Sequence, residues 1–154
     1  MIKKLHILLL LILLTTNSAF SAGSDSSGGS SGGSGAGDGK ISKFKEGHKL
    51  ALSGKYLEKK ADKFKKKGNT KKAEKSLAKA KKKYEKAFKL LLESNKKEPN
   101  KPNTLNYLGF TSRKLGNFED AEKYYLAGLK IKPNHKGINE YLGELYLNTN
   151  RKQK

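Results

Sequence analysis

Few side chains in this sequence could carry out acid–base chemistry or bind a metal. After the first segment, His48 and His135 are the only histidines, and no HxxxH or HExxH pattern occurs. His48 falls on the apolar face of a predicted helix and His135 at a junction between helices, so we expect structural roles for both. Glu140 and Glu144 share a helix face, which a solvated surface explains better than catalysis. We predict no catalytic residue, no metal site and no cofactor.

The sequence also contains no Cys. Disulfides, thiolate metal sites, iron–sulfur clusters and Cys nucleophiles are therefore excluded. Together with the scarcity of histidines, this absence favours a binding protein over an enzyme.

Positive charge is the strongest bias in the composition. Lys and Arg number 34 and Asp and Glu 14, for a net charge of +20. Residues 40–101 hold 23 Lys and 7 acidic residues, whereas residues 102–154 hold 9 basic and 5 acidic residues. Such a field favours an anionic partner, so electrostatic adhesion to anionic lipid or cell-wall polymer is the alternative function that the sequence leaves open.

Nucleic acid fits this charge poorly. Only Arg113 and Arg151 supply the guanidinium groups that contact phosphates in pairs. Aromatic residues are not interleaved with the Lys runs as platforms for base stacking. We therefore do not expect a nucleic-acid partner.

The first 39 residues contain two segments that are not expected to join the folded core. Residues 1–22 have the parts of a secretory signal: Lys3 and Lys4, an apolar run of about 10 residues, and small residues before a cleavage site after Ser21 or Ala22. Residues 23–39 are Gly and Ser with little else, which predicts a disordered linker. We therefore expect secretion across the inner membrane, with the periplasm of a Gram-negative bacterium as the destination.

Residues 40–154 show helical periodicity throughout, which predicts an all-α domain. A first helix is expected to end at Ser53–Gly54. A second is expected from Tyr56 to Phe64, with a turn at Lys67-Gly68-Asn69 after it. A third helical stretch begins with Thr70 as its N-cap and extends to about Asn95. The sequence does not decide whether this stretch is one helix or two.

The most specific signal is a repeat at a fixed interval. The tripeptide Tyr107-Leu108-Gly109 recurs as Tyr141-Leu142-Gly143, 34 residues later. Four further pairs share this interval: Pro99 with Pro133, Ala87 with Ala121, Leu91 with Tyr125, and Tyr84 with Phe118. A period of this length is typical of proteins that stack pairs of antiparallel helices.

The stretch from Asn106 to Pro133 resembles the tetratricopeptide repeat. It departs from that pattern at Leu105, Ser112 and Gly128, where other residue types are usual. The resemblance covers residues 102–135 clearly, and residues 68–101 and 136–154 in part. It implies an α-solenoid of helix pairs that serves as a protein–protein interaction scaffold. The residues expected to pack the repeats are Leu108, Gly109, Gly116, Phe118, Ala121, Tyr125, Pro133, Leu142 and Gly143.

The resemblance also implies where a partner binds. In such arrays the first helix of each pair lines a concave face, which receives a peptide or protein. The residues expected on that face are Asn103, Asn106, Phe110, Arg113, Lys114, Glu140 and Glu144, with Gly137, Leu147 and Asn148 beside them. Because Glu140 and Glu144 oppose the cations, a carboxylate-terminal ligand is not predicted.

The last predicted helix carries an apolar face that a further helix would cover in this family. It consists of five residues at helical spacing, namely Ile138, Tyr141, Leu142, Leu145 and Tyr146. Two explanations stay open: the sequence is truncated, or the face is a docking surface for a partner or a second copy. Self-association through this helix is therefore one expectation.

Overall fold

The computed structural model describes residues 42–151, and within this range the chain is entirely helical outside its turns. The five helices are α1 (Lys43–Lys66), α2 (Thr70–Lys97), α3 (Pro102–Lys114), α4 (Phe118–Ile131) and α5 (Lys136–Asn148). The all-α prediction is confirmed. The predicted signal at 1–22 and linker at 23–39 lie outside the described residues.

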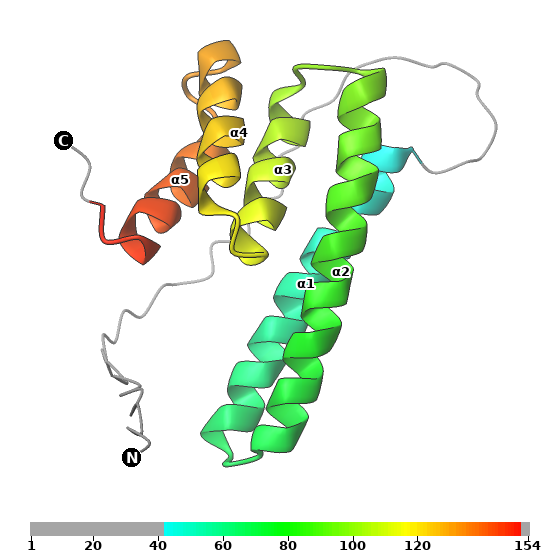
Figure 1. The fold of residues 1–154 in the computed structure, drawn as a ribbon, viewed down its shortest axis with the longest axis vertical. Helices are drawn as coiled ribbons and strands as arrows, with labels where there is room; N and C mark the ends of the chain where they lie inside the picture. Colours follow the sequence, from blue (N-terminus) through cyan, green and yellow to red (C-terminus); the bar gives the residue numbers. More distant parts are fainter. Residues whose placement is uncertain (1–41, 152–154) are drawn as a thin grey trace, which may run out of the picture. The chain divides into compact units, whose positions relative to one another are not determined.

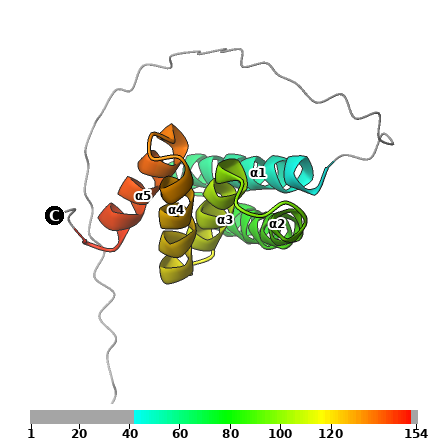
Figure 2. The same ribbon diagram turned by 90° about the horizontal axis from the view of Figure 1, so that it is seen from above.

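Consecutive helices pack against each other, and α3 occupies the middle of the set. It contacts α1, α2, α4 and α5 (Figures 1 and 2). Nine of its 13 residues are buried, whereas α4 and α5 bury three residues each. A helix enclosed on so many sides needs small or polar residues that tolerate close neighbours, and Gly109, Thr111 and Ser112 provide them.

The first helix pair corrects one prediction. The expected break at Ser53–Gly54, with a second helix over Tyr56–Phe64, is wrong, because α1 continues through it to Lys66. Gly54 is buried, and a Cβ added there would overlap the ring of Tyr84 on α2. The glycine is therefore used for close helix packing and not for a turn.

The second helix settles the question left open by the sequence. Residues 70–97 form one continuous helix, with Ala73, Ala80 and Ala87 buried at intervals of seven. Its N-cap is Asn69, whose Oδ1 accepts a hydrogen bond from the backbone N–H of Lys72 at 3.1 Å. The prediction of Thr70 as the cap is wrong by one residue, because the amide of Asn69 reaches the free N–H group of the first turn.

Matching turns close the two helix pairs. Gly68 and Gly116 have φ angles of +70° and +87°, a left-handed conformation that suits glycine. In each turn the following Asn donates its backbone N–H to a carbonyl five residues earlier, Asn69 to Phe64 and Asn117 to Ser112, both at 2.9 Å. The same local chemistry thus reverses the chain in both pairs.

The α1–α2 pair is a lengthened version of the α3–α4 pair. Gly109 on α3 faces Tyr125 on α4 as Gly54 faces Tyr84. Gly54 precedes its turn glycine by 14 residues, but Gly109 precedes Gly116 by 7. Counted from this contact to the turn, the other arm is also longer by seven residues, since Tyr84 lies 16 residues after its turn and Tyr125 only 9. One heptad farther from the turn, Gly47 meets Leu91 in the same way, and Leu91 is the residue that precedes Tyr125 by the repeat interval of 34. Seven residues are close to two helical turns, so each inserted segment keeps the same face inward.

The close contact at Gly109 predicts a difference between two equivalent glycines. A Cβ added at Gly109 would lie 2.5 Å from Cε1 of the buried Tyr125 ring, whereas no described atom lies within 4 Å of a Cβ at Gly143. Gly109→Ala should lower the free energy of unfolding by about 1–3 kcal/mol through overpacking. Gly143→Ala should raise it by up to about 1 kcal/mol through helix propensity.

Chemical denaturation followed by circular dichroism measures both variants. Because the propensity gain is common to the two, their difference isolates the overlap with Tyr125. Equal stability of the two variants would contradict this packing.

Candidate functional site

Aromatic rings link the three first helices of the pairs. Phe44 and His48 on α1, Tyr107 and Phe110 on α3, and Tyr141 on α5 form a continuous series. The ring centroids of His48 and Tyr107 lie 4.3 Å apart, and those of Phe110 and Tyr141 lie 5.0 Å apart. We call the surface that these helices share the α1–α3–α5 face. Its middle is therefore apolar and held by ring contacts.

Ion pairs tie the carboxyl-terminal end of α3 to both neighbours on this face. Lys114 Nζ lies 2.6 Å from Glu58 Oε2 on α1, and Arg113 Nη2 lies 2.5 Å from Glu144 Oε2 on α5. The two pairs differ in exposure: the side chains of Lys114 and Glu58 are 25% and 27% exposed, whereas those of Arg113 and Glu144 are 4% and 43% exposed. They lock the three helices side by side and neutralise two cations expected to meet a partner.

Arg113 is enclosed by aromatic side chains. Its guanidinium carbon lies 5.8 Å from the centroid of Phe110 and 5.7 Å from that of Tyr141, within cation–π range. Burial raises the pKa of the Tyr125 hydroxyl above its ordinary value, an effect that the nearby Arg113 partly offsets. Arg113 therefore acts as a buried structural cation that joins α3 to α5.

The amino-terminal end of the face depends on a histidine cap. His135 Nδ1 accepts the backbone N–H of Ile138 at 3.2 Å, which makes His135 the N-cap of α5. Its Nε2 lies 2.8 Å from Oδ1 of Asn103 on α3. These partners require a neutral ring with its proton on Nε2, and burial lowers the pKa of His135 accordingly. His135 thus has a structural role: it caps α5 and connects that helix to α3.

The predicted partner-binding residues divide into three groups by accessibility. Asn106, Phe110 and Arg113 are buried and packed against neighbouring helices. Lys114 and Glu144 are half-buried and carry the ion pairs described above. Asn103 and Glu140 are exposed, as are Leu147 and Asn148, while Gly137 is half-buried beside the amide of Asn106.

Sequence reasoning missed the contribution of α1 to this face. Lys55 Nζ lies 5.6 Å from the ring centroid of Tyr141 on α5, and Glu58 holds Lys114. The spacing of Phe44, His48, Lys55 and Glu58 places them along one helix face, but a helix interrupted at Gly54 hides that spacing. Reading α1 as one helix would have found them.

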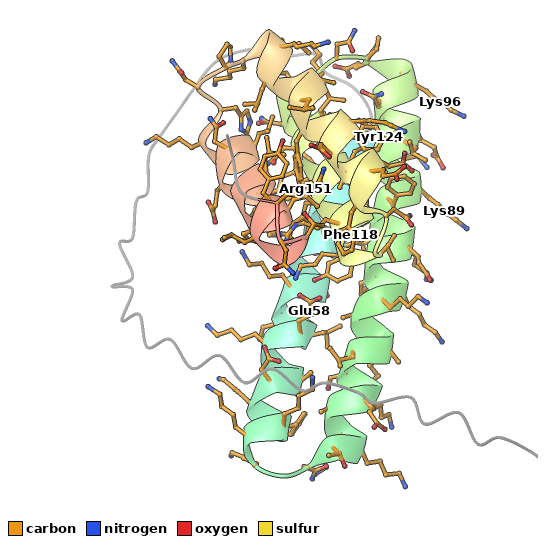
Figure 3. All side chains as sticks on the ribbon, turned by 60° about the vertical axis from the view of Figure 1, so that its left-hand side comes forward. Glu58, Lys89, Lys96, Phe118, Tyr124 and Arg151 are labelled. Carbon is orange, nitrogen blue, oxygen red and sulfur yellow. The ribbon has the colours of Figure 1, made fainter. Side chains whose placement is uncertain are left out.

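Some of the residues predicted to pack the repeats are buried, and others are exposed or half-buried. Leu108, Ala121, Tyr125 and Leu142 are buried, as is Gly109. Phe118 differs from expectation, because it is 39% exposed at the start of α4 (Figure 3). Pro133 is exposed in the turn before α5, Gly116 forms the α3–α4 turn, and Gly143 is half-buried.

Two further properties concern the described part of the chain only. Within residues 42–151, no three His, Asp or Glu side chains cluster closely enough to hold a metal ion. None of the five helices has both the length and the apolar content needed to cross a membrane.

Comparison with known proteins gives one match. The family model of the tetratricopeptide repeat matches residues 102–135, which contain α3, α4 and the turn between them. Searches of curated proteins and of solved structures each returned no match.

The histidine cap predicts a dependence of stability on pH. The pKa of His135 in the folded chain lies below its ordinary value of 6.5, and the pKa of His48 is lowered by burial in the same way. Between the folded and unfolded pKa values the unfolded chain binds more protons, so stability falls as the pH drops from about 7 to 5. The stabilisation is fully present above the unfolded pKa.

The variant His135→Asn keeps a side chain suited to capping but cannot titrate. Its melting temperature should fall less steeply between pH 7 and 5 than that of the unchanged protein, with the remaining slope due to His48. Circular dichroism melts at several pH values provide the measurement. Identical slopes for both chains would exclude His135 as a titrating cap.

Proposed function

We propose that this chain is a scaffold that binds a protein or peptide partner on the α1–α3–α5 face, because residues 102–135 match the family model of the tetratricopeptide repeat. Helical repeats of this kind present the aligned first helices of their pairs as a binding surface. Such repeats are typically scaffolds without catalytic activity. The proposal assigns the partner to one surface and assigns no reaction.

The arrangement of accessible groups on this face is the observation that carries the proposal. The rings of Tyr107 and Tyr141 are half-buried, whereas Asn103, Lys55 and Glu140 on the same three helices are exposed. Lys55 Nζ lies 5.6 Å from the centroid of the Tyr141 ring. No described carboxylate lies within ion-pairing distance of Lys55, and no described cation within that distance of Glu140. Rings of this type provide rigid apolar contact, and free charges of both signs select a partner with complementary charges.

The burial of Arg113 argues against a partner that binds through its carboxyl terminus. Its guanidinium is engaged with Glu144 and two rings, so it cannot clamp a free carboxylate without losing those contacts. A segment with internal apolar side chains and charges of both signs fits better than a carboxyl terminus.

Site-specific photo-crosslinking in cells tests this assignment. A photoreactive phenylalanine analogue replaces Lys55 or Glu140 on the face, and Lys89 as control. Lys89 is exposed and projects from α2 away from the other helices (Figure 3). We expect the same protein adduct from both face positions and none from Lys89. Adducts that form only at Lys89, or equally at all three positions, would contradict binding at the α1–α3–α5 face.

We also propose that the scaffold is exported. The apolar run in residues 5–14 and the small residues before Ala22 support a cleaved signal. Mass spectrometry of the protein from a periplasmic fraction should show a chain that begins at Ala22 or Gly23. Leu9→Lys with Leu10→Lys should leave the uncleaved chain inside the cell. A full-length chain in the membrane fraction would indicate an anchor instead.

A further inference from the structure

The closed end of the α1–α2 hairpin concentrates positive charge. From Lys59 to Lys72 the chain has eight Lys and a single acidic residue, Asp62. With 24 and 28 residues against 13 and 14 in α3 and α4, helices α1 and α2 carry this end beyond α3 (Figure 1). Within the described residues, none of these eight Lys lies within 4.0 Å of a carboxylate oxygen.

Exposed aromatic surface lies inside this basic region. A hollow of about 540 Å³ is lined by Tyr56, Phe64 and five Lys, namely Lys59, Lys60, Lys63, Lys66 and Lys67. The Tyr56 side chain is 66% exposed, compared with 39% for Phe118, the other exposed aromatic residue of the described chain. Phe64 is half-buried. The ammonium groups of Lys60 and Lys72 each lie 5.9 Å from the Phe64 ring centroid. We call these seven lining residues the hairpin patch.

The hairpin patch has the layout of an interfacial helix surface. Its residues recur at intervals of three and four along α1, so they form one stripe of about 16 Å, at 1.5 Å per residue. Lys side chains can extend their ammonium groups toward phosphates while their aliphatic stems stay beside apolar groups. Tyr is a residue type enriched at the level of lipid headgroups.

We propose that the hairpin patch binds the surface of a membrane that contains anionic phospholipid. The Lys ammonium groups contact the lipid phosphates, and Tyr56 inserts among the headgroups. Charge complementarity identifies this occupant, because a dense Lys cluster is attracted to an anionic leaflet. The exposed ring beside the cluster adds an apolar contribution that a soluble polyanion cannot use. This inference concerns a different surface from the α1–α3–α5 face and does not depend on it.

A single-tryptophan reporter tests insertion directly, since the sequence contains no Trp. The reporter Tyr56→Trp is compared with Leu126→Trp on α4, where the native side chain is 43% exposed. With vesicles of phosphatidylglycerol and phosphatidylcholine, the first reporter should shift to the blue and be quenched by brominated lipid. The second should not respond, and vesicles of phosphatidylcholine alone should affect neither. Equal responses from both reporters, or no response from Tyr56→Trp, would overturn the proposal.

A matched pair of charge variants tests the electrostatic part. The first combines Lys59→Gln, Lys60→Gln and Lys63→Gln in the hairpin patch. The control combines Lys79→Gln, Lys82→Gln and Lys86→Gln, which are exposed on α2 and remove the same net charge. Vesicle affinity should fall about a hundredfold in the first variant and much less in the second.

Equal losses in both variants would show that net charge alone attracts the membrane and would overturn the assignment. Both variants and both reporters contain the full chain. Any contribution of the apolar residues 5–14 to vesicle binding is therefore the same in all of them. Circular dichroism melts check that folding is unchanged by these surface substitutions.

Soluble polyglutamate separates a membrane from an acidic protein as the occupant. It should compete at low salt but should not shift the emission of Tyr56→Trp, and its effect should weaken as salt rises. A blue shift with polyglutamate as large as that with vesicles would assign the patch to an acidic protein and reject the membrane.

Discussion

Each helix pair in this protein closes where a glycine on one helix meets a bulky side chain on the next. Gly54 lies against Tyr84 and Gly109 against Tyr125, and in both cases the ring fills the space that a Cβ would occupy. Helix axes approach closely only where such space exists, so these contacts set the separation within each pair. Every other feature of the fold depends on that separation, including the enclosure of α3.

The enclosure of α3 determines which of its side chains reach the surface. Because α3 contacts all four other helices, Phe110 and Arg113 become part of the core, although helical periodicity alone would allow them to face solvent. The burial of Arg113 is compensated by Glu144 from α5 and by the surrounding rings. Charged side chains that stay exposed beside α3 therefore belong to α1 and α5, such as Lys55 and Glu140.

The lengthened hairpin separates two kinds of surface on one chain. Near α3 the charges of α1 are partly matched, as in the pair between Glu58 and Lys114. From Lys59 to Lys72, toward the closed end of the hairpin, the charges are almost all positive, and five of these Lys line a hollow with Tyr56 and Phe64. An extension of seven residues in each arm preserves the packing of α1 on α2, so the added length changes the surface without disturbing the contact at Gly54.

The sequence by itself determined the helical class, the interval of 34 residues and the turns at Gly68 and Gly116, because periodicity and glycine conformation are local properties. It misread Gly54, since a glycine that opens a turn and a glycine that admits a neighbouring ring look identical along the chain. Only the tertiary structure decided between them, through the position of Tyr84. Arg113 shows the same limit. Helical spacing predicted that Arg113 lies on the partner-binding face, but its burial depends on how closely α5 packs against α3. That packing is set by contacts between residues distant in sequence, such as Arg113 with Glu144.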